Sequence, residues 1–163
     1  MKYSEAYQRT RDIDWFFRAG EHYIHVASNG GKLPDFVNDV QRLRKEQAYI
    51  STLGDVKDVE VIVREDYLEA RIRASVDEAR RMNIIRDVQL LREAYLSSFM
   101  SMASKGFYSF DRSNDDEFRY ILVCGPNKHM DLNLKLLDMS NEIEFDDETK
   151  TSFLVRTQYN ELR

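Results

Sequence analysis

The chain contains very little cysteine, proline and glycine. Its 163 residues include one cysteine, two prolines and six glycines. A single cysteine forms no internal disulfide, which excludes a disulfide-stabilised secreted scaffold and favours a reducing compartment. The low proline and glycine content excludes collagen-like and low-complexity sequence. No flexible linker divides the chain, so we expect a single domain over residues 1–163.

Long apolar runs and known catalytic signatures are also missing. No stretch approaches the roughly 18 apolar residues that a membrane-spanning helix needs. The first residues, Met1 to Glu5, are followed by no apolar core of a signal peptide. We therefore expect a cytoplasmic protein with no membrane contact.

No HExxH, zinc-type Cys/His or Walker A spacing is present, so the sequence predicts no metal and no cofactor, and a non-catalytic role is favoured.

Charge of one sign is in excess. There are 24 Lys and Arg residues against 29 Asp and Glu residues, which gives a formal net charge of −5. The acidic excess lies in the last third of the chain, where residues 138–148 hold six acids and no base. An acidic surface repels phosphate backbones, so the composition argues against a nucleic-acid partner. Apolar residues make up 42% of the chain, enough to build a core.

The N-terminal region predicts a β-hairpin. Ile13, Trp15 and Phe17 alternate with other residues, and Gly20-Glu21 then separates this run from a second one containing Ile24 and Val26. Glycine at the first central position suits a type II′ turn. This register pairs Phe17 with Ile24 and Trp15 with Val26, so that all five apolar residues share one face. The other face then holds polar and aromatic residues: Asp14, Phe16, Arg18, Tyr23, His25 and Ala27.

The rest of the chain alternates between helical and extended patterns. Helical spacing begins at Pro34-Asp35 and ends near Gly54, and residues 65–105 read as a helical pair with a break near Asn83, or as one long helix. Strands are predicted at 59–63, 107–110, 118–123 and around Phe153, Val155 and Thr157, with a polar loop at 111–117 and a turn at Gly125-Pro126-Asn127. Residues 131–137 fit a strand or a helix.

The order of these elements predicts an α+β fold, with an antiparallel or mixed sheet covered on one face by about three helices. If the pair 65–105 projects from the sheet, its apolar stripe needs a partner chain to cover it, which would form a dimer.

One loop has the composition of an anion-binding site. Ser28, Asn29, Gly30, Gly31 and Lys32 follow a predicted strand and open onto a predicted helix. Two glycines allow consecutive N–H groups to converge on an anion, and the helix N-terminus and the lysine add positive charge. The spacing is neither that of a Walker A motif nor GxGxxG. A turn that leads into a helix explains the same residues without a ligand.

Three polar residues on the hairpin are further candidates for a ligand site. His25 shares a predicted face with Asp14 and Tyr23, and a carboxylate diagonal to a histidine can orient its ring for proton transfer. His22 lies three residues away, so it points to the opposite face and cannot form a metal pair with His25. Cys124 lies near a predicted strand end and is expected to be buried.

Two functional hypotheses follow from these patterns. The first is a non-catalytic module that binds a protein partner or assembles with itself, because catalytic motifs are missing and a long helical stretch is present. The second is a small-anion or phosphorylated-ligand binding protein or enzyme that uses the Ser28–Lys32 loop. A self-assembling module predicts a mass that increases with protein concentration.

Overall fold

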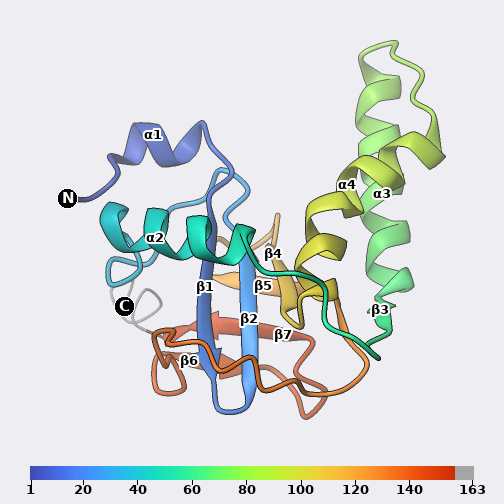
Figure 1. Ribbon diagram of the computed structural model, residues 1–163. Coiled ribbons are helices and arrows are strands. Elements are labelled where there is room, and N and C mark those ends of the chain that lie inside the picture. The colour runs from blue at the N-terminus through green and yellow to red at the C-terminus, as the bar shows by residue number, and fades with distance from the viewer. Residues whose placement is uncertain (157–163) are drawn as a thin grey trace.

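The computed structural model describes residues 1–156, which form a seven-stranded sheet and four helices (Figure 1). The helices are α1 (Glu5–Arg9), α2 (Val40–Ser51), α3 (Glu65–Arg81) and α4 (Val88–Ser104). The strands are β1 (Asp14–Ala19), β2 (His22–Ala27), β3 (Val61–Val63), β4 (Tyr108–Arg112), β5 (Arg119–Pro126), β6 (Ile143–Phe145) and β7 (Ser152–Val155). Among the described residues, none of the helices has the length and apolar character needed to span a bilayer.

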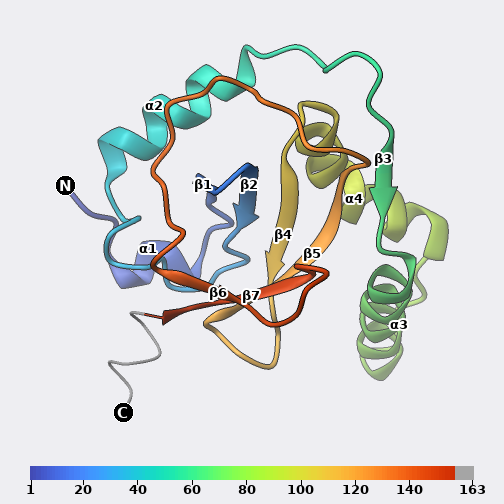
Figure 2. The ribbon, with the colours of Figure 1, turned by 90° about the horizontal axis from the view of Figure 1, so that it is seen from below.

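The sheet is mixed and strongly curled. Its order is β1-β2-β4-β5-β7-β6, and β3 pairs with the second half of β5. Only β2 and β4 are parallel; all the other strand pairs are antiparallel. Figure 2 shows the sheet curling into a half-barrel, with β6 and β7 turned back toward β1 and β2. The predicted α+β class with a mixed sheet is confirmed, although four helices form where about three were expected.

The predicted hairpin register is confirmed. Phe17 lies opposite Ile24, and Trp15 lies opposite Val26. Gly20 has a φ of +60°, and Glu21 is not in the left-handed region, as a type II′ turn requires. One apolar face of the hairpin therefore points into the concave side of the sheet.

Side chains cover both faces of the hairpin, so the packing differs in detail from the expected coverage on one face. On the concave side, Trp15 and Phe17 pack with residues from β5 and β7 such as Tyr120 and Phe153. On the convex side, α3 and α4 cover one apolar cluster that includes Phe99, while α2 and residues 132–136 cover another. The curl brings β5 and β7 against the concave face of the hairpin, and Leu43 of α2 packs in the same cluster.

The helix after the hairpin begins later than predicted. Spacing alone placed its start at Pro34-Asp35, but the carbonyl of Pro34 accepts bonds from Val37 and Asn38 in a separate turn. The α-helix begins at Val40, because the side chain of Asp39 caps it by accepting from the N–H of Arg42. The Ser28–Lys32 loop therefore does not open onto a helix N-terminus.

Residues 65–105 form two antiparallel helices with a break at the expected place. Asn83, with a φ of +58°, lies in the connection between α3 and α4. The base of this α3–α4 hairpin packs on the sheet, and its far end projects away from the body (Figure 1).

Smaller predictions in the last third need correction. Asp111 belongs to β4 rather than to a polar loop, and Gly125-Pro126 belongs to β5 rather than to a turn, because each pairs with a neighbouring strand. Residues 131–137 form neither a strand nor a helix, yet Leu132, Leu134 and Leu136 pack against the core. The final strand includes Phe153 and Val155, and Thr157 lies outside the described residues. Cys124 is buried as predicted.

Candidate functional site

The Ser28–Lys32 loop uses its backbone donors within the protein. All five N–H groups donate to protein oxygens: Ser28 to Ile13 O, Asn29 to the Asp12 carboxylate, Gly30 to Arg11 O, Gly31 to Ser28 O, and Lys32 to the Glu117 carboxylate. Two of these acceptors are negatively charged, so they repel an anion. Two of the three physical arguments for an anion site, free N–H groups and an adjoining helix, therefore lose their basis, and only the charge of Lys32 is left.

Arg112 explains the presence of glycine in this loop. Its guanidinium donates to the carbonyls of Ser28 (3.1 Å) and Asn29 (3.0 Å). A Cβ atom on Gly31 would lie 2.2 Å from Cδ of Arg112, and one on Gly30 would lie 3.1 Å from the carbonyl oxygen of Arg9. The glycines allow close packing of the loop against the body.

His25 and Asp14 meet as the hairpin pattern suggested. Nε2 of His25 lies 2.8 Å from Oδ1 of Asp14, and Nδ1 lies 3.0 Å from Oγ of Ser109 on β4. A serine, a histidine and an aspartate that are connected in series by hydrogen bonds can form a nucleophilic triad. Here Ser109 and His25 are both 0% exposed, and the serine hydroxyl also contacts the carbonyl of Phe99. A substrate cannot reach this buried hydroxyl. The contacts serve instead to link β1, β2 and β4 to α4.

A second buried polar contact joins the helical pair to the sheet. The hydroxyl of Tyr95 on α4 donates to the carboxylate of Asp111 at 2.7 Å, and the guanidinium of Arg71 on α3 lies over the Tyr95 ring. Burial raises the pKa of Asp111 to about 6, although the Tyr95 bond and the Arg71 charge oppose this shift. The sequence pattern did not identify Asp111, because it assigned this residue to a solvated loop. The pattern that could have identified it is the alternation of Ser109 and Asp111, which places both side chains on one face of a strand.

Tyr23 does not join His25. Its hydroxyl donates to Asp131 at 3.3 Å, beside a surface pocket of about 370 Å³ near the β1–β2 turn. His129 lines this pocket, and its ring centroid lies 4.3 Å from that of His22. Burial lowers the pKa of His22 to about 4, and the neighbouring His129 acts in the same direction. The predicted set of loop, Asp14, Tyr23 and His25 is therefore divided among three places.

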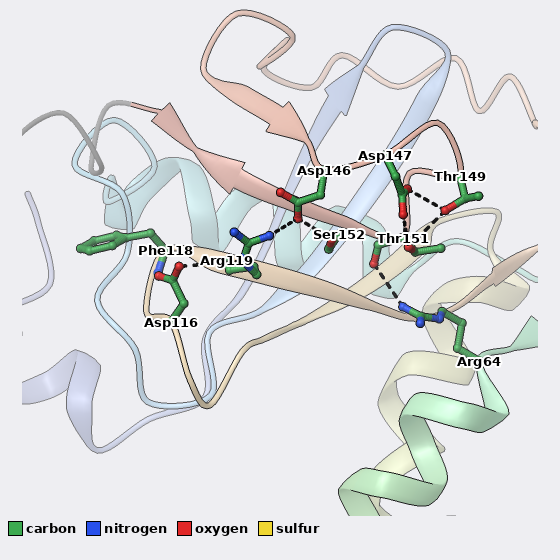
Figure 3. A network of polar contacts seen from close by, with 9 residues as sticks. All are labelled: Arg64, Asp116, Phe118, Arg119, Asp146, Asp147, Thr149, Thr151 and Ser152. Carbon is green, nitrogen blue, oxygen red and sulfur yellow. Dashed lines mark hydrogen bonds and ion pairs between the residues drawn. The ribbon is translucent and has the colours of Figure 1, made fainter.

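The acidic segment 138–148 supports the β6–β7 region. Asp146 contacts both Arg119 on β5 and Ser152, and Asp147 accepts a bond from Thr149 at 2.6 Å (Figure 3). Arg64, which precedes α3, donates to the carbonyl of Thr151 and so links the helical pair to the same region. Within residues 1–156, no group of three or more His, Cys, Asp or Glu residues is arranged to hold a metal ion.

The far end of the α3–α4 hairpin carries an exposed apolar patch. We define the hairpin tip as residues 82–90. Half of the ten exposed large apolar side chains among the described residues lie there: Met82, Ile84, Ile85, Val88 and Leu90. Ile85 is 96% exposed, and Val88 and Leu90 are more than half exposed. Met82, Ile85 and Val88 recur at the three-residue spacing of an apolar helix face, but the hairpin extends past the sheet that would cover them.

The two helices of the hairpin differ sharply in charge. Each has 17 residues, but α3 contains nine charged residues and α4 contains only two, Arg92 and Glu93. Only Glu93 is charged among the exposed positions of α4; the others are Val88, Gln89, Leu90, Ala94, Ser97, Ser98 and Ser101. A solvated helix face normally carries more charge, and this low charge is compatible with a contact surface.

Comparisons with known proteins identify no relative. No family model, curated protein or solved structure matches the chain.

Proposed function

We propose that this protein is an interaction module that binds another protein through its α3–α4 hairpin. The observation that carries the proposal is the cluster of five exposed apolar side chains in the tip. Contiguous exposed apolar surface costs free energy in water, and in folded proteins it marks interaction surfaces. The buried contact between Tyr95 and Asp111 fixes the base of the hairpin on the sheet, which supports its use as a rigid contact element.

The remaining polar features support binding better than catalysis. The nucleophile of the Ser109–His25–Asp14 chain is fully buried, and the loop that resembled an anion site is internally bonded. Neither arrangement presents a reactive group beside an open cavity. The tip, by contrast, is accessible and needs no further rearrangement to reach a partner.

Site-specific photo-crosslinking in cells that express the protein tests the proposal. A benzophenone amino acid replaces Ile85 in the tip, and in a matched control it replaces Tyr49, which is 59% exposed on α2. We expect a discrete crosslinked product from position 85, which disappears when Leu90→Asp is added. Position 49 should give no discrete product. Equal products from both positions, or none from the tip, would overturn the proposal.

A further inference from the structure

We infer that the partner is a second copy of this chain, paired through an antiparallel contact of the two α3–α4 hairpins. This inference rests on the proposed function and names the partner. The contact surface is the groove between α3 and α4, and two such hairpins facing each other form a four-helix arrangement.

The groove has an apolar floor and charged walls. Its volume is about 390 Å³, and Ile72, Val76 and Val88 form the floor. The charged residues along it are Glu65, Glu69, Arg73, Asp77, Arg80 and Arg92. Apolar residues in the centre with charges at the margins are typical of helix–helix contact surfaces.

When two copies of α3 lie antiparallel, residues of opposite charge face each other. Consider a two-fold axis perpendicular to α3 at residues 74–75. It places Glu69 opposite Arg80 of the second copy, at both ends of the contact. It also places Arg73 near Asp77 of the second copy, and Ile72 near its Val76. A two-fold contact repeats each pair twice, so every favourable pair counts double.

A parallel pairing of the two α3 helices would bring like charges together. It would place each charge beside its own copy, with Arg80 against Arg80 and Glu69 against Glu69. Arg80, Arg81 and Arg86 form no salt bridge with any residue from 1 to 156, so they are available to a partner. Glu69 pairs with Arg73 within its own helix, but both side chains are about 70% exposed, and such pairs exchange at little cost.

The size of the surface indicates a weak pair. A helix of 17 residues is about 25 Å long, and two adjacent helices are about 20 Å wide, so one face covers roughly 500 Å². Stable complexes usually bury about 800 Å² per partner. We therefore expect association that depends on concentration in the micromolar range.

A negatively charged bilayer is the main alternative occupant, because Arg86 in the apolar tip and Arg80 and Arg81 just before it could contact anionic lipids. Two observations favour the second copy. Residues 80–90 contain no aromatic residue, whereas membrane-surface segments favour tryptophan and tyrosine. The groove also runs along the side of the hairpin down to Glu65, where a bilayer touching the tip would not reach.

Sedimentation equilibrium of the purified full chain tests the pairing. Over roughly 5 to 500 µM, the apparent mass should rise from 19.3 kDa toward twice that value. Arg80→Glu alone and Glu69→Arg alone should each weaken association at least tenfold, because each creates two like-charge contacts in a homodimer. An equimolar mixture of these two variants should associate again, since every contact between unlike copies is then complementary. Residues 69 and 80 lie about 16 Å apart along one helix, so they cannot restore each other within one chain.

A control variant and the contrary outcomes distinguish self-pairing from binding to a different protein or to a membrane. Arg44→Glu, at an exposed position of α2, makes the same change in charge and should associate like the unaltered chain. A monomer at every concentration, or a mixture that stays monomeric, would overturn the self-pairing. If position 85 still crosslinks to a different protein, the proposed function stands without it. If the monomer instead binds phosphatidylserine vesicles and Ile85→Asp abolishes that binding, the occupant is a membrane surface.

Discussion

The hydroxyl of Tyr95 donates a 2.7 Å hydrogen bond to the carboxylate of Asp111, and this contact joins α4 to the end of β4. Asp111 is 2% exposed, so its carboxylate has little access to water and depends on protein donors. The contact lies at the base of the α3–α4 hairpin and sets the position of the projecting element on the sheet.

Removal of the Tyr95 hydroxyl should destabilise the fold. Tyr95→Phe keeps the ring but leaves the buried Asp111 carboxylate without its side-chain donor, so we expect a loss of about 1–3 kcal/mol in the free energy of unfolding. Urea denaturation at pH 7 measures this loss. Tyr49→Phe, an exposed control on α2, should change the free energy by less than about 0.5 kcal/mol. Equal effects of the two substitutions would show that the Tyr95 bond contributes nothing.

The titration of Asp111 predicts a pH dependence of stability. Burial raises the pKa of Asp111 to about 6 in the folded state, above its ordinary value of 3.8. Between these values the folded chain holds a proton that the unfolded chain has released, so this residue's contribution to stability decreases as pH rises from about 4 to 7. A shift of about two units corresponds to about 3 kcal/mol.

Asp111→Asn isolates this effect, because asparagine cannot titrate and still accepts a bond from Tyr95. Relative to the unaltered chain, the variant should gain about 2 kcal/mol in the free energy of unfolding between pH 4 and pH 7, since the unfolded carboxyl is still partly protonated at pH 4. Denaturation curves at both values measure the difference. Profiles that run parallel over this range would contradict the assignment.

Gly31 and Gly54 should respond very differently to a methyl group. Gly31→Ala places Cβ within 2.2 Å of Arg112 and 2.9 Å of the Ser28 carbonyl oxygen, so the arginine must move and lose its bonds to the loop. We expect a destabilisation of about 1–3 kcal/mol. Gly54→Ala meets no atom within 4 Å and should be close to neutral. Thermal unfolding of the two variants side by side measures the contrast, and a neutral Gly31→Ala would show that the packing against Arg112 is dispensable.

Local patterns predicted most elements of the fold, although not α1 or β6, and they did not predict how the elements are arranged. Alternation along Ile13, Trp15 and Phe17 was sufficient for the hairpin register, because a one-residue shift would move every apolar side chain to the wrong face. The parallel pairing of β2 with β4 was beyond such patterns, since it joins segments about 80 residues apart. The curl that covers the concave face has the same long-range origin.

At the predicted site, the sequence could not show the hydrogen bonds within the protein that compete with a ligand. Asn29 and Lys32 looked available to a ligand, yet Asp12 and Glu117 accept their N–H groups. The Asp14–His25 contact was foreseeable because both residues lie on neighbouring strands of one hairpin. The exposed tip was not, because apolar spacing indicates which side chains share a face without indicating whether anything covers that face.

Isoleucine methyl NMR on a dilution series tests the central claim most directly. Ile72 lies in the groove and Ile85 in the tip, whereas Ile24 on β2 and Ile143 on β6 are buried in the core. If the α3–α4 hairpin is the interaction element and pairs with its own copy, dilution from about 500 to 20 µM should shift the methyl signals of Ile72 and Ile85 and leave those of Ile24 and Ile143 in place. Signals that are all unchanged, or a shift at Ile143 without one at Ile72, would contradict the account.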